Sequence, residues 1–364
     1  MEKRDYLLKY SISPTGYDPA PLTVRDKGSV LILALWTLLF LSLLAFYSGT
    51  MVRQDILLMG RLEERTRLYD VSLSGAMMGM EYMMTLAEEQ DWDFDTLNAK
   101  WADNPSIFKD VKMGGGSFSL EYDHRDNING RTVVRYGLKD EESKINLNHA
   151  GKNILARLLA RSGGIDPLKA EILADSIIDW IDADDIKNGS SGNESEKVEY
   201  NNAGFKYSPS NLPFTCIEEF LFVKGADMKT FCAIRDFITV FGNGKININT
   251  ASREVLSAAG LSDEVIYKII SYRAGIDMTE GSFDDNAFES KEDITDNIMG
   301  YSGLNPVQVK ELEDLVGAGI LDVKSSVYTA KCVGTAVNGG SKGNMILIFE
   351  KNGIIHYIGY IYMV

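Results

Sequence analysis

The chain has 364 residues, 45% of them hydrophobic and 24% charged, with a formal net charge of −15 and a sequence pI near 4.8. This acidic balance argues against a nucleic-acid-binding surface, and the length allows two or more folded units. Three cysteines, Cys216, Cys232 and Cys332, are too few to hold a scaffold together by disulfides. One pair could form in an oxidising compartment, and Cys216 and Cys232 are the nearer two in sequence.

A long uncharged segment lies between Lys27 and Arg53. Residues 28–52 contain no charged side chain, and as a helix they would extend roughly 37 Å, enough to cross a hydrocarbon layer of ~30 Å. Beyond Arg53, apolar residues continue at three- and four-residue spacing to about Glu89, with charged residues between them. The sequence therefore predicts one helix over residues 29–90 that begins in a membrane and ends in water.

The residues before this segment predict its orientation and processing. Residues 1–27 are rich in charge and proline, which indicates an unstructured leader, and Arg25 and Lys27 place it in the cytoplasm. The junction Lys27-Gly28-Ser29, followed by an unbroken apolar run, resembles the N-terminus of type IV pilins and pseudopilins. That resemblance implies that a prepilin peptidase cuts between Gly28 and Ser29, that the freed amine is methylated, and that the apolar segment stays in the inner membrane.

One position departs from the usual pilin pattern. Most pilin-like subunits have a glutamate five residues after the cut, which neutralises the terminal ammonium of a neighbouring subunit, whereas this chain has Leu33. A buried carboxylate without a partner is costly, so a subunit with nothing stacked above it does not need one. In this respect the chain resembles the minor pseudopilin K (GspK) family of type II secretion, whose members lack the glutamate and sit at the fibre tip.

Two groups of predicted strands lie far apart in the sequence. Both are rich in β-branched and aromatic side chains. They cover residues 117–122, 131–138, 327–337, 344–350 and 354–364. Asn352-Gly353 is a strong signal for a two-residue hairpin. A single sheet interrupted by a helical insertion explains both groups, and a long helix packed on such a sheet is the pilin architecture. The predicted fold class is therefore α+β, with an antiparallel sheet and a large all-α insertion.

The insertion contains an internal repeat. Residues 144–148 (KINLN) recur as residues 245–249 (KININ), and each copy leads into two helical patterns, an acidic-apolar stretch and a further helix. The repeat predicts two bundles of the sterile-alpha-motif-like type, and it extends the resemblance to the K family over the chain from Lys27 to Val364. The predicted leader covers residues 1–28 and the long helix residues 29–90. The first part of the sheet covers residues 91–143, and the completing strands cover residues 323–364. Between them lie the first bundle, residues 144–243, and the second bundle, residues 244–322.

The best candidate for site chemistry is an acidic segment of the first bundle. Residues 175–199 contain eight acidic side chains, and carboxylates in a Gly- and Ser-rich loop suit calcium. The EF-hand spacing does not fit, and composition alone favours a solvated acidic loop. The K family binds calcium at a D-W-x-D-A-D-D segment, which residues 179–185 match, so the resemblance implies a calcium site. The candidate ligands are Asp179, Asp182, Asp184, Asp185, Glu194, Glu196 and Glu199, with the choice among the three glutamates left open.

Other chemistry finds little support. The second copy resembles a helix-hairpin-helix DNA module, but its hairpin at residues 259–264 has one glycine instead of two, and two carboxylates where a phosphate would bind. The sequence has no hydrolase, nucleotide-binding or metalloprotease motif. His124, expected in a hairpin turn, His149 and His356 are interpreted as structural or solvated. Gly75 and Gly79 form a G-x-x-x-G outside the apolar segment, which predicts close packing on the sheet.

The resemblance to the K family implies a non-enzymatic, single-pass inner-membrane protein with its C-terminal domain in the periplasm. It implies assembly with the minor pseudopilins I and J, with H as a further candidate partner, on an inner-membrane assembly platform. It also implies initiation and capping of the pseudopilus that exports folded proteins. The alternative is a membrane-anchored helix-hairpin-helix DNA-binding protein of competence type, which the acidic hairpin and the net charge disfavour. A membrane-tethered enzyme would need a pocket with perturbed titratable groups.

Overall fold

A computed structural model describes residues 27–89, 93–188, 195–337 and 340–363 of the chain. The chain divides into two compact units, Met1–Leu62 and Glu63–Val364. Most of the predicted leader, residues 1–26, lies outside the described residues. The first unit consists of the beginning of the long helix, and the second contains the remainder of that helix, a sheet and the helical insertion.

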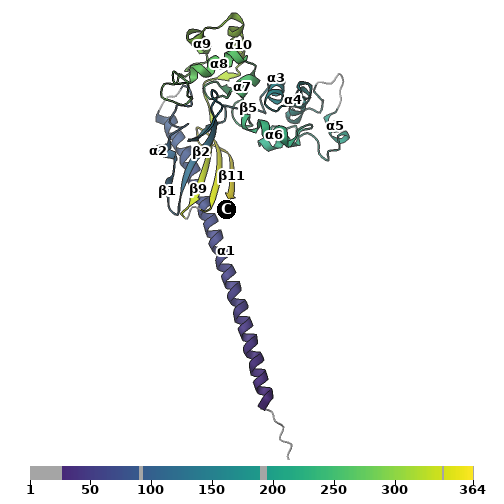
Figure 1. Ribbon diagram of the computed structural model, residues 1–364. Helices are drawn as coiled ribbons and strands as arrows, with labels where there is room; N and C mark the ends of the chain where they lie inside the picture. Colours follow the sequence, from purple (N-terminus) through teal and green to yellow (C-terminus); the bar gives the residue numbers. More distant parts are fainter. Residues whose placement is uncertain (1–26, 90–92, 189–194, 338–339, 364) are drawn as a thin grey trace, which may run out of the picture. The chain divides into compact units, whose positions relative to one another are not determined.

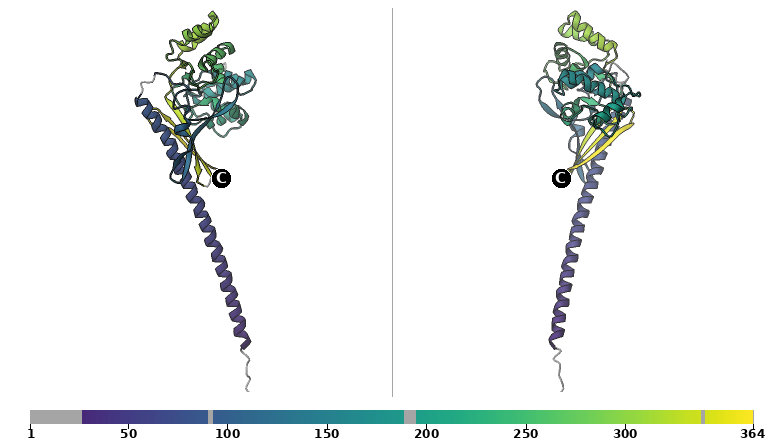
Figure 2. Two further views of the ribbon diagram at one scale, coloured as in Figure 1. Left: turned by 60° about the vertical axis from the view of Figure 1, so that its left-hand side comes forward. Right: turned by 90° about the vertical axis from the view of Figure 1, so that its right-hand side faces the viewer.

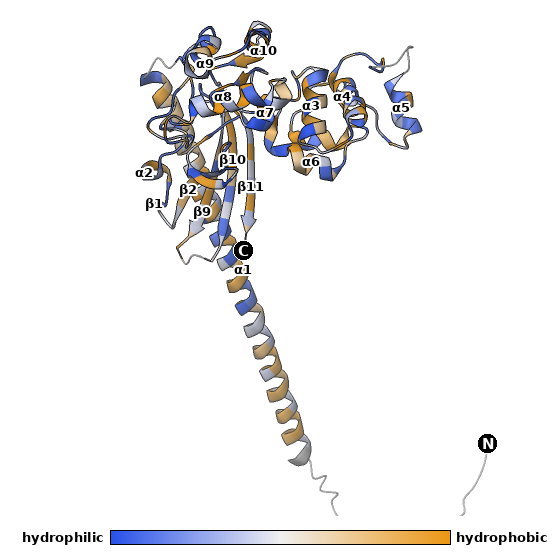
Figure 3. Ribbon diagram, turned by 45° about the horizontal axis from the view of Figure 1, so that its top comes forward, coloured by the Kyte–Doolittle hydropathy of each residue, from blue (hydrophilic) through white to orange (hydrophobic). Residues whose placement is uncertain are grey.

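The longest element is α1 (Lys27–Glu89), a 63-residue helix that contributes to both units. Between Gly28 and Arg53 the helix is uncharged and mostly hydrophobic, as the colours of Figure 3 show, and its large apolar side chains are exposed. This part is long and apolar enough to cross a membrane, as the sequence predicts. The helix is described as far as Glu89, and residues 90–92 lie outside the described residues.

Within the second unit, α1 packs one face on the sheet. The buried side chains of this face recur at helical spacing; the apolar ones are Leu68, Val71, Ala76, Met83 and Leu86. Two glycines allow a close approach. A Cβ atom at Gly75 would lie 2.5 Å from Cys332 Sγ, and one at Gly79 would lie 2.7 Å from Leu120 Cδ1. The prediction that Gly75 and Gly79 serve helix-on-sheet packing is confirmed.

The sheet has seven antiparallel strands in the order β1-β2-β9-β10-β11, with β3 paired to β2 and β4 paired to β9 (Figure 1). The strands are β1 (Val111–Met113), β2 (Gly116–Arg125), β3 (Thr132–Tyr136), β4 (Lys139–Asp140), β9 (Val327–Ala336), β10 (Lys342–Glu350) and β11 (Ile355–Met363). A short helix, α2 (Pro105–Phe108), precedes them. The predicted strands are all present, and β10 turns into β11 at Asn352 and Gly353. Because β9 pairs with β2, β4 and β10, strands from both sides of the insertion share one sheet.

The insertion between β4 and β9 repeats one order of elements. The first copy comprises β5 (Ile145–Asn146), α3 (Lys152–Arg161), α4 (Pro167–Ile181), α5 (Glu196–Asn202), η1 (Ile217–Phe222), α6 (Met228–Ile234), η2 (Arg235–Phe237) and β6 (Ile238–Thr239). The second comprises β7 (Ile246–Asn247), α7 (Arg253–Ala259), α8 (Asp263–Arg273), α9 (Ile294–Ser302), α10 (Pro306–Gly317) and β8 (Leu321–Asp322). Each copy closes with a two-residue parallel pair, β5 with β6 and β7 with β8, in addition to the expected helices. Figure 2 shows these helices gathered at one end of the sheet.

The repeated motif makes the same contact in each copy. Asn148 donates from Nδ2 to the Phe214 carbonyl, and its Oδ1 accepts from the Phe214 N–H. Asn249 makes the same two hydrogen bonds with Phe288. Each asparagine thereby satisfies both backbone groups of a residue that returns to the bundle. The buried apolar side chains of the two copies form one continuous hydrophobic core.

Two expectations for single residues differ from the structure. His124 lies within β2 rather than in a turn, and burial lowers its pKa, although Glu280 Oε2 lies 3.8 Å from its Nε2. The strand predicted over residues 117–122 continues to Arg125, and the turn follows at residues 127–129. Cys216 and Cys232 are free thiols in the structure, so the disulfide that the sequence left open does not form there.

Candidate metal centre

The predicted acidic segment begins at the end of α4. Asp166 caps the start of this helix by accepting hydrogen bonds from the N–H groups of Leu168 and Lys169. Buried apolar residues along α4 place the face that carries Asp179 inside the bundle, and this carboxyl group is 3% exposed. The helix ends at its C-cap, Asp182, so the second carboxyl group lies about one turn further along.

A returning segment brings a glutamate to these two aspartates. Ile186 and Ser195 form an antiparallel bridge, and Ser195 caps the start of α5. Glu196, the first residue of α5, is turned inward and is 1% exposed. One oxygen each of Asp179, Asp182 and Glu196 lies within 4.8 Å of the others. These three residues are called the carboxylate cluster below.

Hydrogen bonds satisfy only part of the carboxylate cluster. Asn188 donates from its backbone N–H and from Nδ2 to Asp179 Oδ1, at 2.9 and 2.7 Å, and from Nδ2 to Asp182 Oδ2 at 3.0 Å. Asp182 Oδ1 and both oxygens of Glu196 are buried and have no hydrogen-bond partner among the described residues. Burying a carboxylate oxygen without a donor costs free energy, so the arrangement favours a bound cation.

The surroundings raise the pKa values of all three carboxyl groups. Burial raises the pKa of Glu196 to about 8, and the charges of Asp179 and Asp182 add to the effect. Burial also raises the pKa of Asp179 to about 6 and that of Asp182 above its usual value, although the hydrogen bonds from Asn188 oppose this. A divalent cation at the cluster would favour the ionised form of each group and so lower these pKa values.

The other two predicted aspartates form local hydrogen bonds outside the carboxylate cluster. Asp184 Oδ1 accepts from the backbone N–H of Ile186 at 2.8 Å, which shapes the turn after α4. Asp185 accepts from Ser195 Oγ at 3.0 Å and from the backbone N–H of Lys197 at 3.3 Å. These bonds hold the start of α5 against the turn, so the two carboxylates position the returning segment.

Of the other two predicted glutamates, Glu199 is among the described residues and lies outside the carboxylate cluster. Glu199 pairs with Lys187 at 2.9 Å and with Lys224. Although burial opposes it, hydrogen bonds from these lysines lower the pKa of Glu199, so its charge is already neutralised. Glu194 lies outside the described residues. Of the two described glutamates, Glu196 therefore lies with the aspartates and Glu199 does not.

The carboxylate cluster and its surroundings fit a hard cation. Carboxylate and amide oxygens are the ligands of Ca²⁺, which takes about six to eight of them at ~2.3–2.6 Å in a flexible geometry. Asp179, Asp182 and Glu196 supply carboxylate oxygens, and Asn188 orients two of the three groups. The sequence does not predict a role for Asn188. It is one of several polar residues in the loop after the acidic run, and nothing in the sequence distinguishes it from the others.

The second copy of the repeat provides an internal comparison. Its loop between α8 and Phe288 carries Glu280, whose Oε1 accepts a hydrogen bond from Nη2 of Arg273, the last residue of α8. Both side chains are buried, with 3% and 1% of their surfaces exposed for Arg273 and Glu280. In this copy a guanidinium neutralises the buried carboxylate of the loop. In the first copy, no described residue gives the carboxylate cluster such a guanidinium partner, which supports an external cation there.

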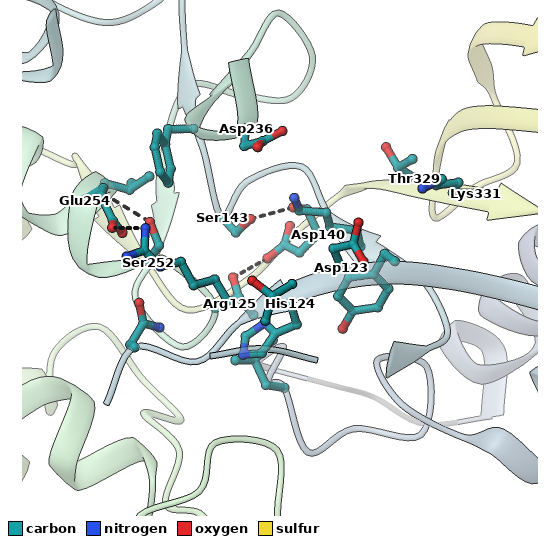
Figure 4. A pocket seen from close by; sticks show the side chains of 18 of the residues that line it. Asp123, His124, Arg125, Asp140, Ser143, Asp236, Ser252, Glu254, Thr329 and Lys331 are labelled. Atoms are coloured by element: carbon teal, nitrogen blue, oxygen red, sulfur yellow. Dashed lines mark hydrogen bonds and ion pairs between the residues drawn. The ribbon is translucent and has the colours of Figure 1, made fainter. Parts of the chain in front are cut away.

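A separate cavity of about 540 Å³ lies between β2, β4 and the start of α7 (Figure 4). Charged side chains of both signs line it, and burial lowers the pKa of Lys139 to about 8 and raises that of Asp140 to about 7. The Ser143 hydroxyl donates to the backbone carbonyl of Asp140 rather than to a basic side chain. The residues that line this cavity include none of the predicted metal ligands.

Comparison with known proteins gives two findings. Residues 127–243 match the family described as type II secretion system (T2SS), protein K. The chain is also similar to a chain in a structure described as the crystal structure of the GspK-GspI-GspJ complex from the enterotoxigenic Escherichia coli type 2 secretion system, with a TM-score of 0.59, 16% identity, and coverage of 84% of this chain and 98% of that one. Together these findings support a type II secretion minor pseudopilin K. No curated protein matches the chain.

The match to protein K contains the candidate metal centre. The matched residues 127–243 run from the β2–β3 turn through the whole first copy of the repeat, and so include Asp179, Asp182 and Glu196. The structural likeness covers 84% of this chain, more than that segment, and shows a shared pilin-like fold. The predicted fold class is thereby confirmed, and the match over residues 127–243 agrees with the predicted family.

Proposed function

We propose that this chain is a minor pseudopilin at the tip of the type II secretion pseudopilus, where it assembles with the minor pseudopilins I and J. The observation that carries the proposal is the likeness over 98% of a chain solved in a GspK-GspI-GspJ complex. The match of residues 127–243 to protein K supports it. The role is structural rather than enzymatic. The minor pseudopilin H and the inner-membrane assembly platform are further candidate partners.

The first part of α1 supports a role in fibre assembly. Its apolar side chains are exposed in the isolated chain. They are therefore available for van der Waals packing against equivalent helices, which favours association. Leu33, 68% exposed, occupies the fifth position after the proposed cut. Without a carboxylate there, the subunit has no group to pair with the terminal ammonium of a subunit above. This supports a place at the end of the fibre.

The insertion supports a capping role. It meets the chain shortly after α1 ends, because the N–H of Asp95 donates to the Val323 carbonyl and Asn247 Nδ2 donates to the Asp95 carbonyl. Two copies of the helical motif therefore add bulk at the end of the pilin domain where α1 finishes. A further subunit stacked on that end would collide with them. The insertion would therefore cap the fibre by sterically excluding further subunits.

The proposal includes proteolytic processing of the N-terminus. A prepilin peptidase cuts between Gly28 and Ser29, the new amine is methylated, and α1 remains in the inner membrane with the second unit in the periplasm. Replacing Gly28 by leucine should leave the precursor at full length when it is exposed to the peptidase. The matched control, Gly49→Leu, lies in the same apolar helix and has open space at its Cβ position, so it should be cut normally. Normal cutting of Gly28→Leu would contradict the proposed cut.

Calcium binding at the carboxylate cluster is proposed to hold α5 against α4. A ligand that binds only the folded form stabilises it by about 2.7 kcal/mol at a free concentration of ~100 times its Kd. Calorimetric titration should show that Asp179→Asn weakens Ca²⁺ binding by about tenfold or more. Glu199→Gln is the matched control and should leave it unchanged, because that carboxylate pairs with lysines. Equal effects of the two substitutions would exclude the carboxylate cluster as the site.

The assembly proposal is tested by purifying the full-length chain in detergent with the I and J subunits, in Ca²⁺ and in chelator. We expect a complex of the three proteins in Ca²⁺ and a lower melting temperature in chelator. Failure to form the complex under either condition would refute the proposed assembly. An unchanged melting temperature would refute calcium binding alone.

The DNA-binding alternative receives no support from the hairpin between α7 and α8. In a DNA-binding hairpin, backbone N–H groups face a phosphate. Here the N–H and the hydroxyl of Ser262 both donate to the Glu311 carboxylate, at 3.2 and 2.8 Å. A carboxylate thus occupies the position that a phosphate would need.

A further inference from the structure

Strand β11 forms one border of the sheet (Figure 1). It pairs with β10 along its length, and among the described residues no strand lies on its other side. Its nine residues span roughly 30 Å, and on the outer side their backbone N–H and C=O groups are available to another extended segment. Such an edge is specific for one kind of partner, because only a β-strand can pair with it along this length.

The side chains of β11 make this edge unusual for one that faces water. They are almost all apolar or aromatic, and Ile358, Ile361 and Met363 are 50%, 59% and 42% exposed. The side chain of His356 pairs with Glu350, with 2.9 Å between His356 Nε2 and Glu350 Oε1. Exposed edges of soluble proteins are normally short, charged or interrupted by proline. β11 has nine residues and contains no Asp, Glu, Lys, Arg or Pro, although its pairing with β10 shifts register where Ile348 and Phe349 face Tyr357 and Ile355.

The other borders of the same sheet are protected. β1 has three residues, includes Lys112 and is followed by Gly114, whose positive φ of 50° turns the chain away. β3 has five residues and follows Arg131. The molecule therefore limits strand pairing at those edges and leaves it open at β11, which indicates that β11 is covered in an assembly.

The position of β11 within the second unit points to the partner. The Tyr360 ring packs edge-on against Tyr69 of α1, with centroids 5.0 Å apart, and the Arg65 guanidinium lies 5.8 Å from the Tyr362 ring centroid. β11 is thus the strand beside this part of α1, where Tyr69 is still 39% exposed. A neighbouring subunit that contacts α1 here also reaches the open edge.

We infer that β11 accepts an apolar, uncharged β-strand from a different pilin-like subunit, which extends the sheet across the subunit boundary. This inference rests on the proposed function, because a subunit that caps a fibre is present once and a second copy of itself is not beside it. Backbone hydrogen bonds supply the affinity, and the exposed Ile358 and Ile361 side chains select a strand without charges. A charged strand opposite them would lose its hydration without gaining a partner.

The test uses the full-length chain in detergent, titrated separately with the I and J subunits. Ile361→Lys should weaken binding of one of them by about tenfold or more, which corresponds to about 1.4 kcal/mol. Ile276→Lys is the matched control, because it places the same charge on a side chain that is 94% exposed in the insertion, and it should leave binding unchanged. Both variants should melt like the unaltered chain, and Ile361→Asn serves as a second variant if Ile361→Lys does not.

Amide hydrogen exchange distinguishes strand pairing from contact through side chains. Binding of the partner should slow exchange at alternate amides of residues 355–363. Equal binding by Ile361→Lys and Ile276→Lys would overturn the inference and leave the proposed function intact, as would weakened binding with unchanged exchange. Self-association that depends on β11 would assign the edge to a second copy and also overturn it. If the unaltered chain binds neither I nor J, the proposed function falls, and this inference falls with it.

Discussion

Glu196 is a carboxyl group whose ionisation conflicts with its surroundings. It is 1% exposed, both of its oxygens lack a hydrogen-bond partner among the described residues, and burial raises its pKa to about 8. The folded state therefore holds a proton on this group at pH values where the unfolded state has released it. The resulting stability is fully present below the usual pKa of about 4.5 and is lost as the pH rises through about 8.

This difference predicts the pH dependence of the metal-free protein. In chelator, the free energy of unfolding of the unaltered chain should fall between about pH 5 and pH 8 by on the order of 2 kcal/mol more than that of Glu196→Gln. Urea unfolding at each pH measures it, and the comparison with Glu196→Gln cancels the contribution of other groups such as Asp140. Saturating Ca²⁺ should abolish the difference. Identical pH profiles of the two proteins in chelator would show that Glu196 does not titrate in this way.

At the scale of elements, the two copies of the repeat differ in how the buried carboxylates of their loops are neutralised. Each has a loop that returns to an asparagine, Asn148 or Asn249, and each loop carries buried carboxylate groups. The second loop holds its carboxylate, Glu280, with Arg273. Among the residues that the structure describes, no guanidinium lies at the carboxylate cluster of the first loop. A built-in cation in one copy and a bound cation in the other would provide the same electrostatic anchor.

This comparison predicts which loop responds to metal removal. Chelation should speed amide hydrogen exchange in residues 182–188 and 195–202, because the carboxylates there repel one another without a cation. Exchange in residues 274–287 should stay the same. Arg273→Met is the reciprocal change and should loosen only the second loop, in Ca²⁺ and in chelator alike. Equal responses of both loops to chelator would contradict a metal site confined to the first copy.

The contact of α1 with the sheet gives a second prediction at this scale. Gly75→Ala should destabilise the protein by about 1–3 kcal/mol, because the added Cβ would lie 2.5 Å from Cys332 Sγ and from the Phe118 ring. Gly60→Ala on the same helix meets nothing within 4 Å and should be neutral or stabilising by up to about 1 kcal/mol. Urea unfolding of the full-length variants in detergent measures both. A neutral Gly75→Ala would mean that helix and sheet can separate without cost.

At the scale of the molecule, three consecutive buried acids join the sheet to the insertion. Asp140, Glu141 and Glu142 are 3%, 2% and 2% exposed. Each accepts hydrogen bonds from a different part of the second unit. Their donors include Asn247 and Thr250 for Asp140, Thr239 and Thr329 for Glu141, and Ser326 and Asn243 for Glu142. The junction is thus held by carboxyl groups at its centre, and their donors come from both copies of the repeat, from the sheet and, for Glu141, also from Lys144.

A buried ion pair completes this junction and provides the last prediction. Lys351 donates to both oxygens of Asp95, at 3.0 and 2.8 Å, and Asp95 is fully buried. Lys351→Met should cost about 3–5 kcal/mol, because it leaves the Asp95 charge without its cation. The double variant Asp95→Asn with Lys351→Met should recover a large part of that loss. Thermal unfolding measures both, and a double variant no more stable than Lys351→Met would exclude the charge as the cause.

Much of the fold could be predicted because its signals are local. The apolar run from residue 28, the helical spacing up to Glu89, and the Asn352-Gly353 turn each depend on residues close together in the chain. The end of β2 could not be predicted in the same way. His124 and Arg125 belong to that strand because they pair with Val133 and Thr132 of β3, and this cross-strand register is not visible in the residues of either strand alone.

The sequence by itself determined that this protein has an apolar N-terminal helix, a sheet interrupted by a repeated helical motif, and an acidic segment of the right chemistry for a cation. Only the tertiary structure decided that Glu196 joins Asp179 and Asp182 while Glu199 pairs with lysines. The same holds for the open edge of β11. The physical reason is that periodicity and residue type describe each segment alone, whereas burial and charge pairing depend on which segments, distant in the chain, come to lie within a few ångströms of one another.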